Sequence, residues 1–442
     1  MTFKDLILRK SLPFITGLMI LTIPISLDSC KQKEDVEFPV IQFLKPYESA
    51  FYSVGDTIPI QAEISDNNAI EFIDITLTDE NFNPVLKTYN PPFNSNPFTL
   101  VFDYPINDNF LESGIYNLLI RAGDGTQIKN KYQRIYIGAL PKTNVGIAYS
   151  IGNSPFSSVG VYHLWPALQN SPYNLNASNT FQLAAIPYQN ILAVASLNNG
   201  KIVLYNYLTG DSITFLKDIS LVDKSLSGIK GSAKALYLFF DNGLNHRYTY
   251  LGFKNLVFES PNFTTTNLID FDDLIVTTCK KTTYPFQERI QTFQNTTGAA
   301  LNSYYIDFKA VRLFRMNNSI LVFGLKNQQI TAHEYFPNQN QLSSLKTLGS
   351  FDFRGSCQID NELFLILTNN QVLLFNTKTR TSSTFLNNIT GNQIEFDPVN
   401  NIIFITENHN IYMYSYPTKT LTGQIGLEIN KSINQIIPLY NR

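Results

Sequence analysis

The sequence is poor in charged residues, cysteine, histidine and tryptophan. Asp, Glu, Lys and Arg make up 15% of its 442 residues, and the formal net charge is −2. This balance gives no general electrostatic attraction to nucleic acid or to anionic lipid, so no nucleic-acid partner is expected. Three cysteines are too few for a disulfide scaffold, and we expect Cys279 and Cys357 to be buried thiols.

The sequence also lacks a recognisable catalytic arrangement. It has no Gly-x-Ser-x-Gly element, and its four histidines are not grouped as zinc ligands would be. Acidic residues cluster at Asp270, Asp272 and Asp273 and again at Asp360 and Glu362. Paired carboxylates can hydrolyse glycosides, but these lie just before apolar runs, where turn residues are expected. We therefore predict a non-enzymatic protein without metal or cofactor, and keep a hydrolase or lyase as the alternative.

Aromatic and β-branched residues are abundant, which favours strands and turns over helices. Hydrophobic residues make up 44% of the chain and aromatic residues 13%. In the C-terminal two-thirds, an aromatic residue near the end of a strand-like segment recurs at intervals of 39 to 45 residues. The series is Trp165, Tyr205, Tyr250, Phe293, Tyr335, Phe375 and Tyr414. A period of about 40 to 45 residues is typical of one four-stranded propeller blade.

A short apolar run precedes each of these aromatic residues. The seven runs are 145–149, 191–195, 236–240, 274–278, 320–323, 363–367 and 402–406. They are nearly continuous rather than alternating, which indicates strands buried on both faces, as in sheets packed around a ring. The sequence therefore predicts an all-β fold with a seven-bladed propeller over residues 141–442. The C-terminal segment 432–441 is expected to complete the first blade and close the ring, which also protects the sheet edges.

This pattern resembles the WD40-like and quinoprotein-like propellers. The Gly-His and Trp-Asp signatures of WD40 repeats, the tryptophan-rich repeats of quinone-binding propellers and the Asp-box of sialidases are absent. The resemblance therefore implies the architecture only.

The N-terminal segment predicts export rather than part of the fold. Lys4, Arg9 and Lys10 precede the uncharged, mostly apolar run 11–27, which is typical of a signal peptide. The end of this run, with Leu27, Ser29 and Cys30, resembles the lipobox of bacterial lipoproteins, although Asp28 departs from the usual small or apolar residue. The resemblance implies a signal peptide over residues 1–29 and a diacylglycerol-bearing Cys30 on a flexible tether over residues 30–37.

The charged triplet that follows the cysteine indicates the final location. Lys33, Glu34 and Asp35 resemble the export signal of surface lipoproteins of Bacteroidota. That resemblance implies an outer-membrane protein, anchored by lipid and facing the cell surface.

Residues 38–140 contain about seven short strand-like segments separated by turns, which favours a β-sandwich. The segment resembles the Ig-like and cadherin-like domains of bacterial surface proteins. In that family, turns rich in Asp and Asn can bind calcium, which would involve Asp66, Asn67, Asn68 and Asp124. The alternative is that these residues cap turns through their own backbone. We expect the domain to act as a spacer.

Aromatic residues in or near the loops that connect blades are the candidate ligand-binding residues, because aromatic faces stack on sugars and on apolar peptide side chains. They are Tyr173, Tyr188, Phe263, Tyr284, Phe286 and Phe353. The alternative is that these rings pack under the loops. Two basic spots, Lys280-Lys281 and Arg312–Arg315, are interpreted as solvated faces.

The functional prediction joins these elements. A surface lipoprotein presents a propeller as a protein-binding or assembly platform in an outer-membrane complex for nutrient uptake or for protein export and assembly. The alternative is a surface protein that binds or cleaves glycans, and a glycan or peptide ligand fits either hypothesis.

Overall fold

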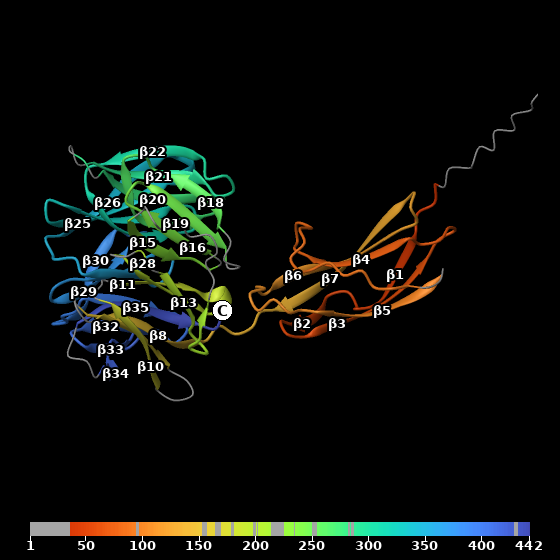
Figure 1. Ribbon diagram of the computed structural model, residues 1–442, viewed down its shortest axis with the longest axis horizontal. Helices are drawn as coiled ribbons and strands as arrows, with labels where there is room; N and C mark the ends of the chain where they lie inside the picture. Colours follow the sequence, from red (N-terminus) through yellow and green to blue (C-terminus); the bar gives the residue numbers. More distant parts are fainter. Residues whose placement is uncertain are drawn as a thin grey trace, which may run out of the picture. The chain divides into compact units, whose positions relative to one another are not determined.

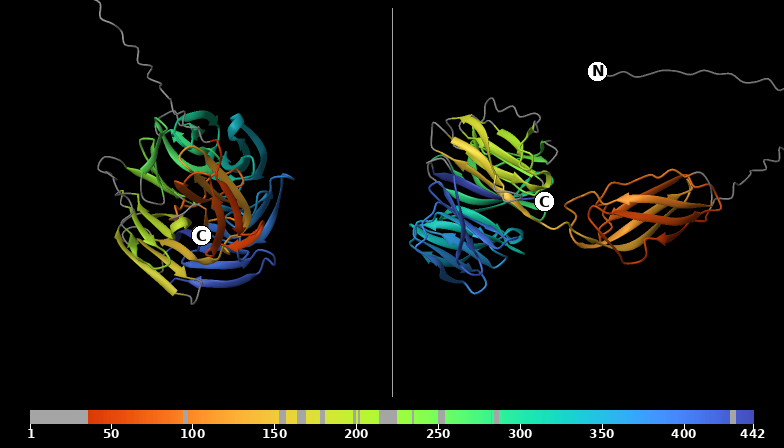
Figure 2. Two further views of the ribbon diagram at one scale, coloured as in Figure 1. Left: turned by 90° about the vertical axis from the view of Figure 1, so that its right-hand side faces the viewer. Right: turned by 90° about the horizontal axis from the view of Figure 1, so that it is seen from below.

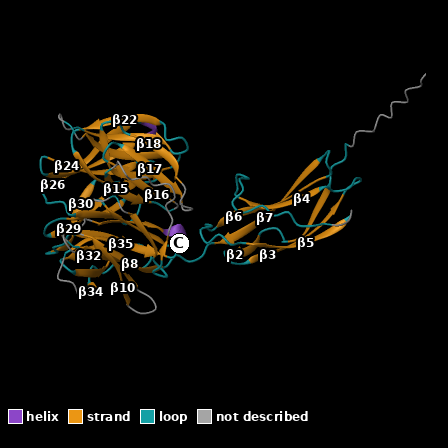
Figure 3. Ribbon diagram, in the orientation of Figure 1, coloured by secondary structure: helices purple, strands orange, loops and turns teal. Residues whose placement is uncertain are grey.

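The structure is a computed structural model. It describes residues 36–93, 97–152, 157–163, 169–177, 181–197, 200, 202–213, 225–233, 235–249, 254–281, 283, 287–427 and 432–442. Within these ranges the secondary structure is almost entirely strand, with two 3₁₀ turns, η1 (Pro187–Gln189) and η2 (Pro337–Gln339) (Figure 3). No helix in the described ranges is long and apolar enough to span a bilayer. The expectation of an all-β chain is confirmed.

The described chain divides into two compact units. The first ends at Gly138 and the second starts at Ala139, with Asn109–Glu112 grouped with the second unit. In Figure 1 the first unit is coloured orange and the second runs from yellow to blue. Cys30 and the rest of the predicted leader and tether up to residue 35 lie outside the described residues.

The first unit consists of two sheets. One sheet has the order β1-β3-β5, with β1 (Val40–Lys45), β3 (Thr57–Ser65) and β5 (Phe98–Pro105). The other has the order β2-β7-β6-β4, with β2 (Ala50–Ser53), β7 (Ile128–Gly138), β6 (Gly114–Gly123) and β4 (Phe72–Thr78).

The two sheets of the first unit form a sandwich around an apolar interior. Residues 58, 60, 62 and 64 of β3 are buried while their neighbours are more exposed, which is the alternation of a strand with one wet face. Tyr104 of β5 links the sheets, since its hydroxyl accepts the Leu77 N–H of β4 at 3.1 Å. The same hydroxyl donates to the Lys87 carbonyl at 2.9 Å. Burial raises the pKa of Tyr104 to about 12.

The second unit contains, over its described residues, seven four-stranded antiparallel sheets. The left panel of Figure 2 shows the yellow, green, teal and blue sheets following one another around a ring. This arrangement is a β-propeller.

Each sheet has an inner strand that contacts inner strands of neighbouring sheets. The inner strands are β11 (Phe181–Ile186), β15 (Leu226–Gly231), β19 (Phe263–Phe271), β23 (Lys309–Arg315), β27 (Gly355–Gln358), β31 (Gln393–Asp397) and β35 (Ile433–Tyr440). The second strands are β8 (Asn144–Ile151), β12 (Ile191–Ser196), β16 (Ala235–Phe240), β20 (Leu274–Lys281), β24 (Ile320–Lys326), β28 (Leu363–Leu367) and β32 (Ile402–Glu407).

The third and outer strands complete each sheet. The third strands are β9 (Ser157–His163), β13 (Ile202–Asn206), β17 (Leu244–Thr249), β21 (Glu288–Gln294), β25 (Gln329–Phe336), β29 (Gln371–Asn376) and β33 (Asn410–Ser415). The outer strands are β10 (Gln169–Ala177), β14 (Ser212–Ile213), β18 (Lys254–Glu259), β22 (Ala300–Ile306), β26 (Gln341–Gly349), β30 (Thr381–Asn387) and β34 (Leu421–Gly426).

The seven apolar runs of the sequence all lie on second strands. All six residues of β12 and of β16 are buried, because these strands have a sheet on each face. Five of the recurring aromatic residues lie on third strands, namely Tyr205, Phe293, Tyr335, Phe375 and Tyr414. Trp165 and Tyr250 lie outside the described residues.

The first sheet combines segments from both ends of the second unit. Its order is β10-β9-β8-β35, and β35 pairs antiparallel with β8, with Ile436 opposite Tyr149. Asp397 of β31 is fully buried. One carboxylate oxygen accepts the Asn144 amide of β8 at 2.9 Å, and the other accepts the Tyr440 hydroxyl of β35 at 3.2 Å.

Candidate binding site in the central cavity

The inner strands surround a cavity of about 870 Å³. Six of them, β11, β15, β19, β23, β31 and β35, contribute lining residues. We call this space the central cavity. Its volume is in the range of small-molecule sites, which typically measure about 300 to 1,000 Å³.

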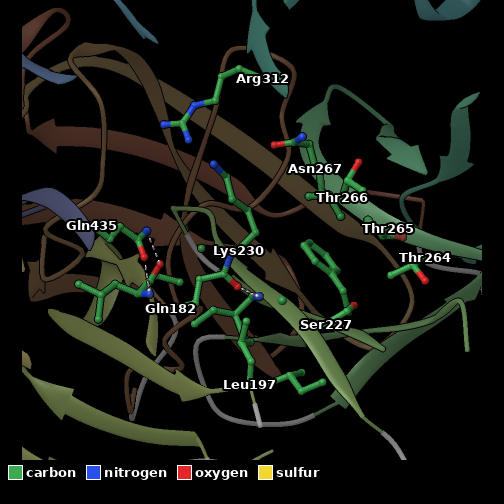
Figure 4. A pocket seen from close by; sticks show the side chains of 18 of the residues that line it. Gln182, Leu197, Ser227, Lys230, Thr264, Thr265, Thr266, Asn267, Arg312 and Gln435 are labelled. Atoms are coloured by element: carbon green, nitrogen blue, oxygen red, sulfur yellow. Dashed lines mark hydrogen bonds between the residues drawn. The ribbon is translucent and has the colours of Figure 1, made fainter. Parts of the chain in front are cut away.

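Side-chain amides join neighbouring inner strands at the wall of the central cavity. Gln435 of β35 accepts the Leu183 N–H of β11 at 2.8 Å and donates to the Leu183 carbonyl at 3.0 Å. Gln182 of β11 accepts the Ile229 N–H of β15 at 2.7 Å. These bonds pair backbone N–H and C=O groups of the inner strands that are not hydrogen-bonded to another strand. Figure 4 draws the bonds as dashed lines.

Three consecutive inner strands carry a bulge where they face the central cavity. The pairing register shifts at Ser227 in β15, at Thr266 in β19 and at Val311 in β23. A bulge inserts one unpaired residue and redirects the side chains that follow it. Asn267 and Arg312 come directly after two of these bulges, and both line the central cavity.

Charged side chains meet inside the cavity. Arg312 of β23 and Glu395 of β31 form an ion pair, with Nη2 and Oε1 3.0 Å apart. Lys230 of β15 lines the same space, and Figure 4 shows its ammonium pointing toward the Arg312 guanidinium. Lys280 and Asp241 complete the charged lining.

Enclosure by protein shifts the pKa values of these groups. Burial, and next the positive charge of Arg312, lower the pKa of Lys230 to about 8, against a smaller opposing effect of Glu395. The Lys230 side chain is nevertheless accessible to solvent, because the central cavity that encloses it is itself open to water. Burial raises the pKa of Glu395, although Arg312 and Lys230 act in the other direction. Burial raises the pKa of the neighbouring Cys357 thiol as well.

The sequence did not single out this group of residues. The interpretation of Arg312 as part of a solvated face is incomplete, because its side chain, although 37% exposed, lines the central cavity and pairs with Glu395. The bulge at Val311 changes the side-chain alternation that a regular strand would have. Cys279 and Cys357 are free, buried thiols, as expected.

Of the six predicted ligand-binding aromatic residues, the structure describes the side chains of Tyr188, Phe263 and Phe353, which lie on different elements. Tyr188 lies in η1 and is half-buried. Phe353 lies in a loop, and its ring packs against the core around Phe323 and Phe364. Tyr284 and Phe286 lie outside the described residues. Tyr173 lies on β10, but its side chain is outside the described part of the structure.

Phe263 is not a loop residue. It is the first residue of β19, where it pairs with Lys281, and it is buried. The Arg289 guanidinium covers its ring at 3.8 Å. The preceding turn ends at Asn262, which has a positive φ of 66°, so Phe263 lies next to a loop, and its ligand-binding role stays a prediction.

The candidate calcium residues occupy turns of the first unit. Asp124 is buried, and its Oδ1 accepts the N–H groups of Thr126 and Gln127 at 2.7 and 2.6 Å. Asp66 Oδ1 accepts the N–H of Asn67 at 2.8 Å. These bonds are those of turn-capping side chains. Within the described ranges, no three His, Cys, Asp or Glu side chains are grouped to hold a metal ion. A calcium role for Asp66, Asn67, Asn68 and Asp124 stays a prediction.

The two acidic groups that suggested a hydrolase as the alternative also have structural contacts. Asp270 accepts the Tyr237 hydroxyl at 2.5 Å. Asp360 accepts the N–H groups of Glu362 and Leu363, each at 2.8 Å, as a turn residue does. These contacts give Asp270 and Asp360 structural roles.

No protein-family model matches the chain, and no curated protein matches it either. Among solved structures it is similar to a quinonprotein alcohol dehydrogenase-like protein from Bacteroides thetaiotaomicron, at 12% identity, with 91% of this chain and 99% of that chain covered and a TM-score of 0.46. It is also similar to TolB from Acinetobacter baumannii, at 11% identity, with 75% and 80% covered and a TM-score of 0.42.

A third similar structure is BamB from Moraxella catarrhalis, at 10% identity, with 65% of this chain and 90% of that chain covered and a TM-score of 0.40. Likenesses at this level carry no functional argument. The class of the protein follows from its own sheets: it is an all-β protein whose second unit is a β-propeller with a polar, charged central cavity.

Proposed function

We propose that this chain is a non-enzymatic lipoprotein of the outer membrane whose propeller binds a protein partner. The partner belongs to a membrane complex that takes up nutrients or that exports or assembles surface proteins. The observation that carries this proposal is the exposed outer strand β22.

Strand β22 is an outer strand that presents two large apolar side chains to solvent. Leu301 is 50% exposed and Tyr305 is 60% exposed, and Leu301 is the residue that a bulge in β22 leaves unpaired. Tyr304, on the other face, packs toward Tyr335 with a ring-centroid distance of 6.5 Å. No other outer strand has two exposed large apolar side chains among those that the structure describes. An exposed strand edge of this kind is a template for an added strand from a partner.

A groove of about 860 Å³ lies next to the C-terminal end of β22 and includes Tyr305 in its wall. Four lysines line the groove, against the two acidic residues Glu288 and Asp307. They are Lys280, Lys281, Lys309 and Lys326. The excess of positive charge favours a partner segment that carries acidic residues, because complementary charge steers association and fixes register.

Site-specific photo-crosslinking in intact cells tests this role. A photoreactive amino acid at position 305 is expected to give one defined adduct with a membrane protein. The matched control is position 421 on outer strand β34, where Leu421 is 53% exposed and does not line the groove beside β22. Equal adducts at both positions, or none at position 305, would contradict a docking edge at β22.

The lipid anchor rests on the sequence. Lipid chains on Cys30 would hold the protein at the membrane, since each buried methylene adds about 0.8 kcal/mol. We expect Cys30→Ala to release the protein into the soluble fraction and to abolish its labelling by a radioactive palmitate precursor. Protease treatment of intact cells tests the surface orientation, and full protection of the wild-type protein would overturn it.

The proposal assigns residues 1–29 to the signal peptide, 30–37 to the tether, 38–140 to an Ig-like spacer and 141–442 to the propeller. The three-stranded and four-stranded sheets of the first unit support an Ig-like sandwich, as does its size of about 100 residues. The pairing of β35 with β8 supports the inference that the C-terminal strand closes the ring.

A second candidate function is glycan binding by the first unit. An aromatic strip lies on its four-stranded sheet, where Phe51 stacks on Tyr136 at 5.6 Å and Phe82 meets Tyr132 edge-on at 4.9 Å. All four rings are exposed, and exposed aromatic faces are suited to sugars. A glycan array with the wild type and with Phe51→Ala/Tyr136→Ala tests this candidate. Binding that the double variant loses would favour it, and the absence of any wild-type binding would remove it.

A further inference from the structure

The charges inside the central cavity do not cancel. Arg312 and Glu395 neutralise each other across the cavity at 3.0 Å. Lys280 and Asp241, which also line it, add one charge of each sign. Lys230 remains, and it forms no ion pair within the described part of the chain. The cavity therefore holds one positive charge that the described residues do not neutralise.

Neutral hydrogen-bond donors lie around this positive charge. Asn267 of β19 points into the space near Lys230 and Arg312 (Figure 4). Gln182 uses its Oε1 to accept the Ile229 N–H, so its amide Nε2 is available as a donor toward the cavity. Two cations with amide donors around a solvent-accessible space provide what an oxyanion needs: charge and several N–H groups.

We propose that the central cavity binds a small anionic molecule, whose oxyanion group is held between Lys230 and Arg312. The guanidinium offers a planar pair of N–H donors and the ammonium a point charge, which suits phosphate and carboxylate groups. The cavity is large enough to hold the rest of a small molecule that carries this phosphate or carboxylate group. No described residue of β22 lines the central cavity, although Lys280 lines both this cavity and the groove beside β22.

The bound anion would act on the titration of Lys230. The charged groups that line the cavity with Lys230 are Arg312, Glu395, Lys280 and Asp241, and the Cys357 thiol lies near Glu395 and Arg312. Burial and Arg312 lower the pKa of Lys230 to about 8 in the free protein. Anion binding requires the protonated ammonium, so affinity is expected to fall as the pH rises through about 8.

Calorimetric titration of the purified soluble protein with inorganic phosphate tests the site, with acetate as the carboxylate probe and chloride at equal ionic strength as the reference. Stronger binding of phosphate identifies a phosphate-type ligand, and stronger binding of acetate a carboxylate-type ligand. Lys230→Met should lower the affinity roughly 10- to 100-fold, the usual effect of losing a charged hydrogen bond. Lys378→Met, on an exposed turn, is the matched control and should leave binding unchanged.

Glu395→Gln makes the test independent of loss of folding. Its amide oxygen can still accept a bond from Arg312, while the net charge of the cavity rises by one, so phosphate should bind more tightly than to the wild type. The proposal is overturned if the wild type binds neither probe beyond the chloride reference. It is also overturned if Lys230→Met binds as the wild type does, or if Glu395→Gln binds more weakly. The β22 substitution Tyr305→Lys should leave phosphate binding intact, so failure of the partner proposal stays distinguishable.

Discussion

The two edge strands of each propeller sheet face different surroundings. Inner strands face the central cavity, and side chains of neighbouring inner strands satisfy part of their free backbone: Gln435 bonds to Leu183, and Gln182 bonds to Ile229. Outer strands face solvent, and β22 presents Leu301 and Tyr305 there. Side chains of the protein thus satisfy backbone groups of two inner strands, whereas β22 presents apolar side chains that another molecule can cover. The comparison separates residues that hold the ring together from residues that are free to bind.

Removal of residues 432–442 should have the largest effect on this comparison. The deletion takes away β35, leaves β8 as an unpaired inner edge and removes Gln435 from β11. We expect the propeller to lose its cooperative thermal transition, measured by calorimetry. Addition of a synthetic peptide of residues 432–442 is the control and should restore part of the transition. A deletion variant that melts like the wild type would show that β35 does not close the ring.

Asp397→Ala should have the next largest effect. Besides Asn144 and Tyr440, the carboxylate accepts the Val399 N–H at 3.0 Å and the Asn400 amide at 2.7 Å. Loss of several hydrogen bonds to a buried charged group should lower the free energy of unfolding by about 3 kcal/mol or more. Urea denaturation measures this change. The matched control Asp352→Ala removes an exposed carboxylate and should change stability by less than about 0.5 kcal/mol.

The glutamine contacts of the inner edge allow a graded test. Gln435→Leu leaves both the N–H and the carbonyl of Leu183 without a side-chain partner, and should cost about 1 to 3 kcal/mol of unfolding free energy. Gln182→Leu removes the side-chain partner of only one backbone group, the Ile229 N–H, and should lower the unfolding free energy by less than Gln435→Leu does. Parallel urea titrations compare the two variants. Equal stability of both variants and the wild type would mean that solvent replaces these bonds without cost.

The smallest effect is a pH dependence that arises at Lys230. Its pKa is lowered from 10.5 to about 8 in the folded protein, so between these values the unfolded chain binds more protons. Stability therefore rises with pH across this window, and the cost of charging Lys230 is fully present below about pH 8. Lys230→Met should be more stable than the wild type near pH 7 and lose this advantage above pH 10. Melting curves at several pH values check this, and an advantage that is the same at all pH values would contradict it.

The sequence predicted the fold better than the site. Second strands were predictable because burial on two faces makes them continuously apolar, as in β12. Third strands were predictable because an aromatic residue recurs near their ends. Lys230, Arg312 and Glu395 could not be found this way, because they are far apart in sequence and meet only when the ring forms. The bulge before Arg312 also interrupts the alternation of side chains between the two faces of β23, from which the direction of the Arg312 side chain would have been predicted.

Amide hydrogen exchange of the purified protein, resolved to single residues, tests most directly whether the inner edge is closed and β22 is open. The account predicts slow exchange for the N–H groups of Leu183 and Ile229, which donate to Gln435 and Gln182. It predicts fast exchange for the β22 amides that point away from β21. Slow exchange along the outer side of β22, together with fast exchange at Leu183 and Ile229, would contradict it.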